Sequence, residues 1–474
     1  MGKQALITHI DDLSSELCAV AEDLWNNPEL GLHEEQSAAR LKAVLSAEGF
    51  SIESGTGSMP TAFIASYGES NPRIGILGEY DALPGLSQAV RAERDPIEPE
   101  GPGHGCGHNL FGTAGIGAAI AIKRAIETGE LEGTIEFFGC PAEETLVGKT
   151  YMARAGAFDE LDAAVTWHPG TLTTPRRGSS NALNSLLFTF EGESAHAAGA
   201  PASGRSALDG VELMNIGVEY MREHISDDAR VHYAITDGGQ APNVVPAEAS
   251  VWYFVRAPTR AEVKRNTEWV RDIAEAAATM SQTEVRERFL TGCYDYQANE
   301  TVTDVIWENM QEIDPVEYSD ADRTFARNLQ QTIPAERIEQ NLDSLPEAVY
   351  DTVRDKALYT EPVPAYDEDE QSHGSTEVGD VSWITPTGQF RAATWPLGVP
   401  GHSWQVVAAN GDFARNGMIY AAKVIAGTVY DLFDNPDILS EAQSEFEEAI
   451  GSDSYESPLP AEAQPPFDIT SLTP

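Results

Sequence analysis

The sequence predicts an α/β protein in which a mostly parallel sheet flanked by helices forms one domain and a smaller α+β domain is inserted into it. Strand and helix patterns alternate over the first 180 residues, which is typical of a parallel sheet. From residue 185 the order becomes β-α-β-β-α-β, that of a ferredoxin-like module. With 474 residues, the chain also exceeds the size at which a single core keeps growing.

The elements of the first domain follow from the spacing of its apolar residues. Apolar residues three and four positions apart mark a helix that stops at a glycine. Short apolar runs bounded by polar residues predict three strands, and a longer run predicts a second helix. These elements are a helix through Ala38, Leu41 and Leu45 that ends at Gly49, a helix at residues 110–128, and strands at 74–77, 134–138 and 162–167.

The inserted domain is predicted over residues 185–298. Its pattern predicts strands at residues 186–190, 231–235, 250–255 and 283–289, with helices at 207–221 and 261–278. The first domain, which carries the candidate metal site, then comprises residues 1–184 and 299–450. Residues 451–474 are rich in proline, glutamate and serine, so we expect a disordered acidic tail. The acidic stretch 314–370 is weakly patterned, and its role stays open.

The charge of the chain is strongly negative. It carries 76 acidic and 30 basic residues, a formal net charge of -46. Such a charge strains a compact fold by self-repulsion, but at molar salt the Debye length falls to about 3 Å and surface charges are largely screened. We therefore predict that the protein is adapted to a high-salt cytoplasm, as in a halophile. The acids are interleaved with periodic apolar segments, which argues against a basic partner or a disordered protein. The sequence contains no basic patch, so it does not predict nucleic-acid binding.

Other features of the chain predict a reduced, soluble, cytoplasmic protein. The first residues are polar and acidic, so we expect no secretory signal. The longest apolar run, residues 110–122, is too short to span a bilayer, and we expect no membrane association. Four cysteines in a chain of this length do not form a disulfide framework.

Cysteine and histidine alternate with glycine at residues 104–108. Cys106 and His108 can both reach a metal ion when the backbone between them is tight, and Gly105 and Gly107 allow that. A lone Cys-x-His pair is more often a buried structural pair, but His104 within the same five residues favours a site. The helix predicted to follow points its N-terminus here, which favours a thiolate at Cys106.

Two adjacent carboxylates, Glu143 and Glu144, follow the strand predicted at residues 134–138. Adjacent side chains cannot point the same way, so one can bind a metal ion while the other acts as a general base for an activated water. A solvated acidic pair would be the simpler interpretation in so acidic a chain. Cys140, Pro141 and the buried strand before them weigh against it.

Five further residues are candidates, and each alone has a simpler structural interpretation. A lone histidine is more often a structural residue than a ligand. His168 gains weight because it follows a predicted strand, and His402, in a loop rich in glycine and proline, gains less. In the inserted domain His196 follows a strand, while Asn243 and Arg256 carry the donors that bind carboxylates.

Together these segments closely resemble the M20 metallopeptidase family, in particular its amidohydrolase and aminoacylase branch, from about residue 10 to about residue 435. The matching motifs occur in order and at fitting separations, which makes the combination very specific. They are Gly-Cys-Gly-His-Asn at residues 105–109, Pro-Ala-Glu-Glu at 141–144, Ala-His-Ala-Ala at 195–198 with Gly-Arg-Ser-Ala-Leu at 204–208, and Asn-Val-Val-Pro at 243–246.

The resemblance implies a catalytic domain with two divalent metal ions per chain and an inserted lid domain that forms the dimer. It implies Glu143 as the general base and allows Cys106 to bridge the ions. His196 would stabilise the oxyanion in the partner subunit's site, Asn243 and Arg256 would hold the substrate carboxylate, and Asp81 is a weaker candidate for orienting a ligand histidine. The implied metal ligands are Cys106, His108, Glu144, His168 and His402.

Three departures from the family pattern limit what carries over. The peptidase branch has histidine where this chain has Glu79, so the amidohydrolase branch is the better template. Asn109 stands where an aspartate is expected, and this can change a contact behind the ligands. Trp404 stands in place of a proline two residues after His402, and this can reshape the substrate pocket.

The predicted activity is hydrolysis of the amide bond of N-acyl or N-aroyl amino acids, of aminobenzoyl-glutamate, or of short peptides. The ligand set suits zinc or manganese, with cobalt possible. The expected assembly is a homodimer through the lid domain, or a heteromer with a related subunit. Two rival functions remain: a thiol amidase with Cys106 as nucleophile, and a metal-free, non-catalytic protein that binds carboxylates.

Overall fold

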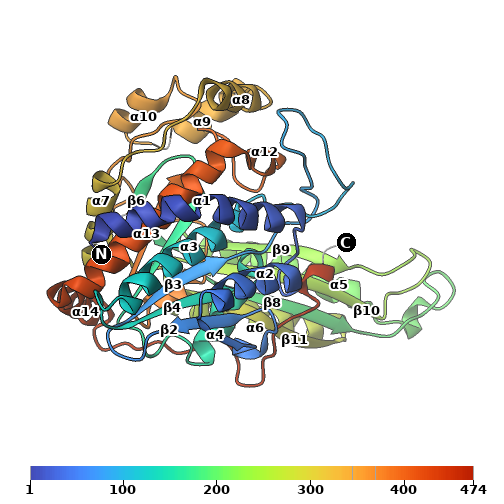
Figure 1. Ribbon diagram of the computed structural model, residues 1–474. Coiled ribbons are helices and arrows are strands. Elements are labelled where there is room, and N and C mark those ends of the chain that lie inside the picture. Colours follow the sequence, from blue (N-terminus) through green and yellow to red (C-terminus); the bar gives the residue numbers. More distant parts are fainter. Residues whose placement is uncertain (1, 344, 369, 473–474) are drawn as a thin grey trace. The chain divides into compact units, whose positions relative to one another are not determined.

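The computed structural model describes residues 2–343, 345–368 and 370–472 (Figure 1). The chain forms two compact units, each with its own core, and each is described here by itself. Unit 1 comprises Met1–Gly178, Gln297–Glu370 and Val381–Tyr455, and unit 2 comprises Ser179–Tyr296, Gln371–Asp380 and Glu456–Pro474.

A seven-stranded sheet runs through unit 1 in the order β1-β2-β4-β3-β5-β13-β6. Its four inner strands are parallel, and the antiparallel pairs lie toward the two edges. This is the mostly parallel sheet that the alternating pattern predicted, and the fold class is confirmed. The strands are β1 Ser51–Ser54, β2 Phe63–Tyr67, β3 Arg73–Glu79, β4 Thr134–Cys140, β5 Ala163–Gly170, β6 Thr174–Arg176 and β13 Thr387–Ala393.

Helices flank this sheet. Helix α2 ends as predicted before Gly49, whose φ of 90° lies in the left-handed region that favours glycine. Helix α3 is rich in glycine, and a Cβ at Gly112 would stand 2.8 Å from the carbonyl oxygen of Glu79, so glycine lets the helix approach β3 closely. The helices of unit 1 include α1 Lys3–Asn26, α2 Glu35–Ala47, α3 His108–Glu127, α4 Gly148–Arg154, α7 Glu300–Glu312, α12 Trp404–Ala408, α13 Asp412–Asp434 and α14 Pro436–Ile450.

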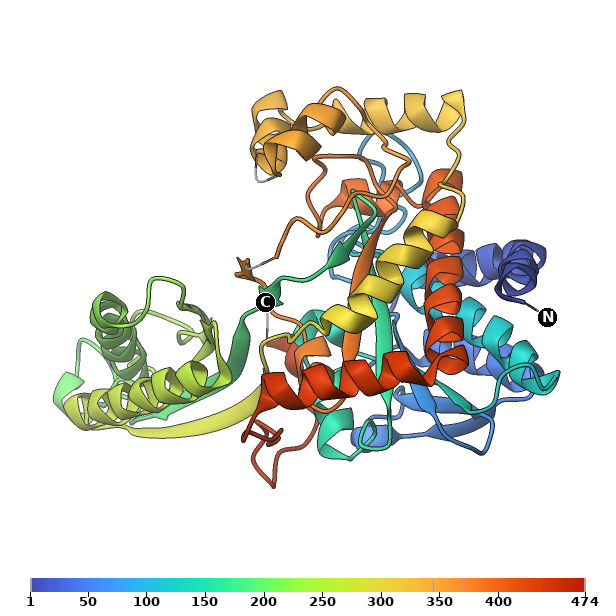
Figure 2. The same ribbon diagram turned by 90° about the vertical axis from the view of Figure 1, so that its left-hand side faces the viewer.

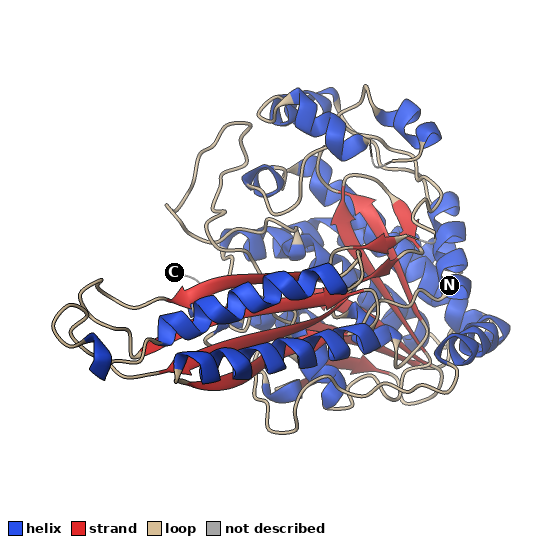
Figure 3. Ribbon diagram, turned by 180° about the vertical axis from the view of Figure 1, so that it is seen from behind, coloured by secondary structure: helices blue, strands red, loops and turns tan. Residues whose placement is uncertain are grey.

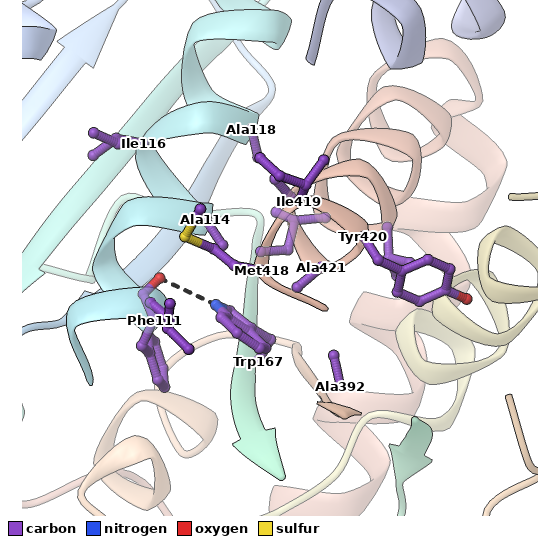
Figure 4. Packing of buried hydrophobic residues seen from close by; sticks show 14 of the residues in the cluster. Phe111, Ala114, Ile116, Ala118, Trp167, Ala392, Met418, Ile419, Tyr420 and Ala421 are labelled. Atoms are coloured by element: carbon purple, nitrogen blue, oxygen red, sulfur yellow. Dashed lines mark hydrogen bonds between the residues drawn. The ribbon is translucent and has the colours of Figure 1, made fainter. Parts of the chain in front are cut away.

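The core of unit 1 joins α3 and α13 to the sheet (Figure 4). Trp167 of β5 is fully buried, and its Nε1 donates a hydrogen bond to the carbonyl oxygen of Phe111 at 3.1 Å. Met418 of α13 is buried beside them. Burying a side chain of this size contributes about 1.5–3 kcal/mol. The packing fixes α3, and with it the N-terminal end that carries His108, relative to the strand that carries His168.

A group of three short helices occupies the acidic stretch whose structure the sequence left open (Figure 2). Ser319 and Asp322 form a capping box at the start of the first of them. An apolar cluster that includes Leu342, Val353 and Leu397 joins the group to the rest of unit 1. The helices are α8 Asp320–Gln330, α9 Ala335–Leu342 and α10 Glu347–Val353.

Unit 2 is built on a four-stranded antiparallel sheet in the order β11-β8-β10-β9. Two helices cover one face of it (Figure 3), and each begins at a residue whose side chain caps it, Ser206 for α5 and Thr259 for α6. The β-α-β-β-α-β order is the predicted one. The elements are β8 Ala182–Glu191, α5 Ala207–Met221, β9 Arg230–Asp237, β10 Glu248–Ala257, α6 Arg260–Ser281 and β11 Glu284–Cys293.

The unit boundaries differ from the predicted domains: the first segment of unit 2 is Ser179–Tyr296 rather than residues 185–298, and unit 2 includes two further segments. Residues 371–380 belong to unit 2, where β12 Gln371–Ser372 pairs with β7 Ser179–Ser180. Most of the expected disordered tail belongs to unit 2 as well. Asp468 forms an ion pair with Arg288, and Ile469 is buried. Composition misses this because a few buried anchors suffice to dock an otherwise polar segment.

No helix in the part of the chain that the structure describes combines the length and the apolar character that a membrane crossing requires.

Candidate functional site

The candidate site lies where three parallel strands of unit 1 end. Glu79 is the last residue of β3, Glu143 and Glu144 follow β4, and His168 lies near the end of β5. Because β4, β3 and β5 are parallel neighbours, their carboxyl ends meet at one edge of the sheet. The fold therefore brings these side chains together although they are far apart in the sequence.

One group of side chains able to hold a metal ion consists of Cys106, His108 and His168. The Sγ atom of Cys106 lies 3.4 Å from Nε2 of His168. Gly107, at φ 76°, turns the chain between Cys106 and His108, and a Cβ there would lie 3.0 Å from Pro169. The backbone between the two candidate ligands is thus tight, as the sequence suggested.

A second group consists of Cys106, Glu144 and His402. Nε2 of His402 lies 3.3 Å from Oε2 of Glu144. The backbone amide of His402 donates to the carbonyl oxygen of Gly105 at 2.9 Å, which ties the loop of His402 to the loop of Cys106. Cys106 belongs to both groups, so its sulfur is placed between two positions at which an ion could be held.

Asp81 connects the two groups. Its Oδ1 lies 2.8 Å from Nδ1 of His108, and its Oδ2 accepts a hydrogen bond from the backbone amide of Glu144 at 2.9 Å. Burial opposes ionisation, but the neighbouring His108 and the hydrogen bonds hold the pKa of Asp81 below its usual value. A carboxylate at Nδ1 leaves Nε2 of His108, on the other side of the ring, as the atom that could bind a metal ion.

Glu143 forms a third group able to hold a metal ion, with Glu79 and His108, and its Oε2 lies 3.9 Å from Nε2 of His108. It precedes Glu144 in a loop that starts with Ala142 in the left-handed region, at φ 56°. The carboxylate of Glu34, which the sequence did not single out, accepts a hydrogen bond from the amide of Ala142 at 2.7 Å. Burial raises the pKa of Glu34 to about 8.

The structure also reveals a buried ion pair that the sequence reasoning missed. Nζ of Lys149 lies 2.8 Å from Oε1 of Glu79, and both side chains are almost fully buried. Oε2 of Glu79 lies 3.4 Å from Nε2 of His108. The sequence offered one signal for a role of Lys149. Lysine is scarce in this chain, and Lys149 follows the candidates Glu143 and Glu144 by only a few residues.

Two expectations about the cysteine-histidine segment differ from the structure. His104 lies apart from the metal groups, because its Nε2 contacts the carbonyl oxygen of Leu24 at 3.2 Å. The thiolate expected at Cys106 is not favoured by the protein alone. Burial and the nearby Glu144 raise the pKa of the Cys106 thiol well above its usual value. A cation beside the sulfur would be needed to reverse this effect.

The departure at Asn109 has a clear structural role. Its amide exchanges hydrogen bonds with the amide of Asn410, at 3.2 and 3.0 Å, and it also donates to the carbonyl oxygen of Ala21 at 3.0 Å. Both asparagines are buried. This neutral pair links the start of α3 to the segment just before α13, where an aspartate would introduce a buried charge.

The remaining candidates belong to unit 2. Nδ1 of His196 accepts hydrogen bonds from the amides of Ala198 and Gly199 at 3.2 and 3.1 Å. Asn243 lies on the adjoining loop, where its carbonyl oxygen accepts from the amide of Ala197. Arg256 lies on β10, and its Nε is buried without a hydrogen-bond partner among the described residues.

The residues of unit 1 fit a metal-binding role. Oε2 of Glu79, Nε2 of His108 and Oε1 of Glu144 are buried and have no hydrogen-bond partner among the residues that the structure describes. Buried polar atoms are rarely left without a partner. The measured separations of 3.3 and 3.4 Å also suit a tetrahedral site, where ligand atoms at about 2.0–2.3 Å from zinc lie about 3.3–3.7 Å apart.

Residues 75–322, more than half of the chain, match the sequence profile of peptidase family M20/M25/M40. The chain is also 39% identical to a p-aminobenzoyl-glutamate hydrolase subunit from Escherichia coli K12 over 456 residues, which cover 94% of this chain and 95% of that protein. The chain belongs to the M20/M25/M40 peptidase family. The resemblance drawn from the four motifs is therefore confirmed.

Other relatives and solved structures are less similar in sequence. The human Xaa-Arg dipeptidase is 30% identical and covers 60% of this chain and 65% of its own. A dinuclear metal-binding M20 peptidase from Bacillus subtilis superposes with a TM-score of 0.57 at 18% identity, covering 90% of this chain and 99% of its own. An aminobenzoyl-glutamate utilization protein from Klebsiella pneumoniae superposes with a TM-score of 0.59 at 17% identity, covering 87% and 98%. These structures establish the shared fold, and family membership makes this chain a peptidase or amidohydrolase.

Proposed function

We propose that this M20 protein is a metal-dependent amidohydrolase that cleaves an amide bond next to a free carboxylate. Its substrates are N-acyl or N-aroyl amino acids of the aminobenzoyl-glutamate type, or short peptides. The observation that carries the proposal is the pair of candidate ligand groups that share Cys106, with Glu143 beside them. The 39% identity to one component of p-aminobenzoyl-glutamate hydrolase supports the substrate class.

Two divalent ions would be held by the candidate ligands, with Cys106 common to both. Bound there, the ions would polarise the substrate carbonyl and lower the pKa of a water molecule. The donor set of one thiolate, imidazoles and carboxylates suits zinc or manganese, with cobalt possible. The ligands would be Cys106, His108 and His168 for one ion and Cys106, Glu144 and His402 for the other.

Glu143 is the proposed general base. Its carboxylate takes a proton from the attacking water as the new carbon–oxygen bond forms at the amide carbonyl. It then delivers that proton to the amide nitrogen as the carbon–nitrogen bond breaks, so that a carboxylic acid and an amine leave. Glu144 cannot share this role, because its Oε2 lies beside His402 and its backbone is held by Asp81.

Unit 2 supplies the proposed contacts to the substrate. Because Nδ1 of His196 accepts two backbone hydrogen bonds, the neutral ring carries its proton on Nε2 and can donate to an oxyanion. Arg256 forms no ion pair with a described carboxylate, although acids outnumber bases more than twofold in this chain. With Asn243 it would hold the substrate carboxylate, so the carboxamide analogue of a substrate is expected to be cleaved poorly.

Metal removal separates this proposal from its rivals. Dialysis against a chelator is expected to abolish hydrolysis of a panel of aminobenzoyl-glutamate, N-acetyl amino acids and dipeptides, and added zinc or manganese is expected to restore it. A thiol amidase using Cys106 would survive the chelator, while a non-catalytic carboxylate-binding protein would bind panel members without cleaving them. The metal content of the untreated protein is measured in parallel and is expected to be about two ions per chain.

The assembly is proposed to be a homodimer through unit 2, or a heteromer with a related protein. Tyr220 of α5 is 74% exposed, and Tyr233 and Ile235 are exposed on the edge strand β9, which leaves apolar surface for a partner. If His196 acts in the partner's site, mixing inactive His196→Ala and Glu143→Gln chains is expected to restore part of the activity. Activity that stays absent in confirmed mixed dimers would contradict a role across the dimer.

The net charge of -46 supports adaptation to a high-salt cytoplasm. The midpoint of thermal unfolding is expected to rise as KCl increases from 0.1 to about 2 M, because screening relieves repulsion between surface carboxylates. The same series with a neutral osmolyte at equal osmolality serves as the control. A midpoint that falls or stays constant with KCl would contradict the adaptation.

A further inference from the structure

His402 has an unusual backbone conformation for a residue proposed to bind a metal ion. Its φ is 55°, in the left-handed region that residues other than glycine seldom adopt, and its side chain is 59% exposed. Such a conformation persists only where the surroundings hold it in place. The contacts of the loop around it, residues 396–405 and here called the His402 loop, show what holds it.

On the side of the candidate site, the His402 loop contacts the segment around Cys106. The amide of His402 donates to the carbonyl oxygen of Gly105 at 2.9 Å. Within the loop, the hydroxyl of Ser403 donates to the carbonyl oxygen of Pro400 at 2.8 Å, whereas Gly401 has open space where its Cβ would be. Support for the rest of the loop therefore comes from elsewhere in unit 1.

That support comes from the helices of the acidic stretch. The side-chain amide of Gln330, at the end of α8, donates to the carbonyl oxygen of Leu397 at 2.7 Å. The side-chain amide of Asn341, in α9, donates to the carbonyl oxygen of Gly398 at 2.8 Å. The amide of Leu397 donates in turn to the carbonyl oxygen of Ala357 at 2.9 Å.

Packing reinforces these hydrogen bonds. Gly398 has a φ of 74°, and a Cβ there would lie 2.6 Å from Cγ2 of Ile338, so α9 lies directly on the loop backbone. Leu397 is fully buried in the apolar cluster that also contains Leu342 and Val353. Beyond His402, the side chain of Gln405 donates to Oγ1 of Thr332 at 3.1 Å. The helices α8 and α9 and the turn between them therefore contact the loop on both sides of His402.

We infer that Gln330 and Asn341 are positioning residues that hold the His402 loop in the conformation that directs His402 toward Glu144. The acidic stretch 314–370 thereby contributes to the site through the candidate ligand group of Cys106, Glu144 and His402. This inference rests on the proposed function insofar as His402 is proposed as a ligand. The group of Cys106, His108 and His168 contains no residue of the loop and is the internal reference.

The test compares the double variant Gln330→Ala/Asn341→Ala with the matched control Gln331→Ala/Gln340→Ala. The control side chains are exposed, lie next to the tested ones and form no hydrogen bond with described residues. Hydrogen–deuterium exchange of the chelator-treated proteins is measured first. Residues 396–405 of the test variant are expected to exchange about tenfold to thirtyfold faster, as expected for the loss of two hydrogen bonds. Residues 103–110 and α8 itself keep wild-type exchange, which shows that the fold is intact.

Zinc titration of the same proteins gives the second readout. The wild type and control are expected to bind two ions, and the test variant to bind one with unchanged affinity and the other at least about tenfold more weakly. Unchanged exchange of residues 396–405, or two unaltered zinc affinities in the test variant, would overturn the inference. A wild type that binds no zinc would instead contradict the proposed function, and the exchange experiment would still decide whether the two amides hold the loop.

Discussion

Glu143→Gln is expected to lower kcat by a factor of about 10² to 10⁴ while leaving metal content and KM close to those of the wild type. Glutamine keeps the size of the side chain but cannot accept the proton of the attacking water. Glu143 also lies in a group with Glu79 and His108 that could hold an ion, but the two groups that share Cys106 are unchanged in this variant, so both proposed ions should stay bound. Steady-state kinetics on a cleaved panel substrate and metal analysis of the same sample provide the measurement.

The matched control for this experiment is Glu144→Gln. Glu144 belongs to one of the two groups that share Cys106, whereas Glu143 belongs to neither of them and is proposed as the base, so the neighbouring substitution should reduce metal content as well as turnover. The assignment of the two roles would be wrong if Glu143→Gln lost metal, or if Glu144→Gln kept both ions and lost only kcat.

Lys149→Met is expected to lower the free energy of unfolding by about 3–5 kcal/mol, because it leaves the buried carboxylate of Glu79 without its cationic partner. Chemical denaturation at fixed pH and salt measures the loss. Lys423→Met removes a lysine whose partner Asp11 is half exposed, and this control should cost about 0–1 kcal/mol. Equal losses for the two variants would show that the buried pair contributes no more than a surface pair.

The fold could be predicted largely from periodicity. Three strands of unit 1, β3, β4 and β5, and the β-α-β-β-α-β order of unit 2 occur where the apolar spacing predicted them, because each element buries one face against a neighbour. The other strands of the unit 1 sheet, β1, β2, β6 and β13, were not placed from the sequence. The helices α8, α9 and α10 escaped prediction. They are short and polar, and α9 and α10 have one fully buried residue each, so their apolar signal is too sparse to exceed that of a loop.

The candidate site could be predicted only at the level of its motifs. The glycines around Cys106 and the adjacent Glu143 and Glu144 carry local signals that the sequence displays. The pairing of Lys149 with Glu79 joins residues 70 positions apart and leaves no local pattern. His104 illustrates the opposite error, since a histidine within the motif packs against the carbonyl of Leu24 in α1. Proximity along the chain indicates a site, but the direction of each side chain depends on packing.

The buried pair of Lys149 and Glu79 responds to salt differently from the charges on the protein surface. Dissolved ions cannot approach a lysine and a glutamate that have almost no contact with solvent, so this attraction has the same strength in dilute buffer and in brine. The carboxylates of the surface, in contrast, feel every change in ionic strength. In a protein of this composition, the charge interactions beside the candidate site therefore stay constant as the salt concentration changes. The charge interactions on the surface change with the salt concentration of the medium.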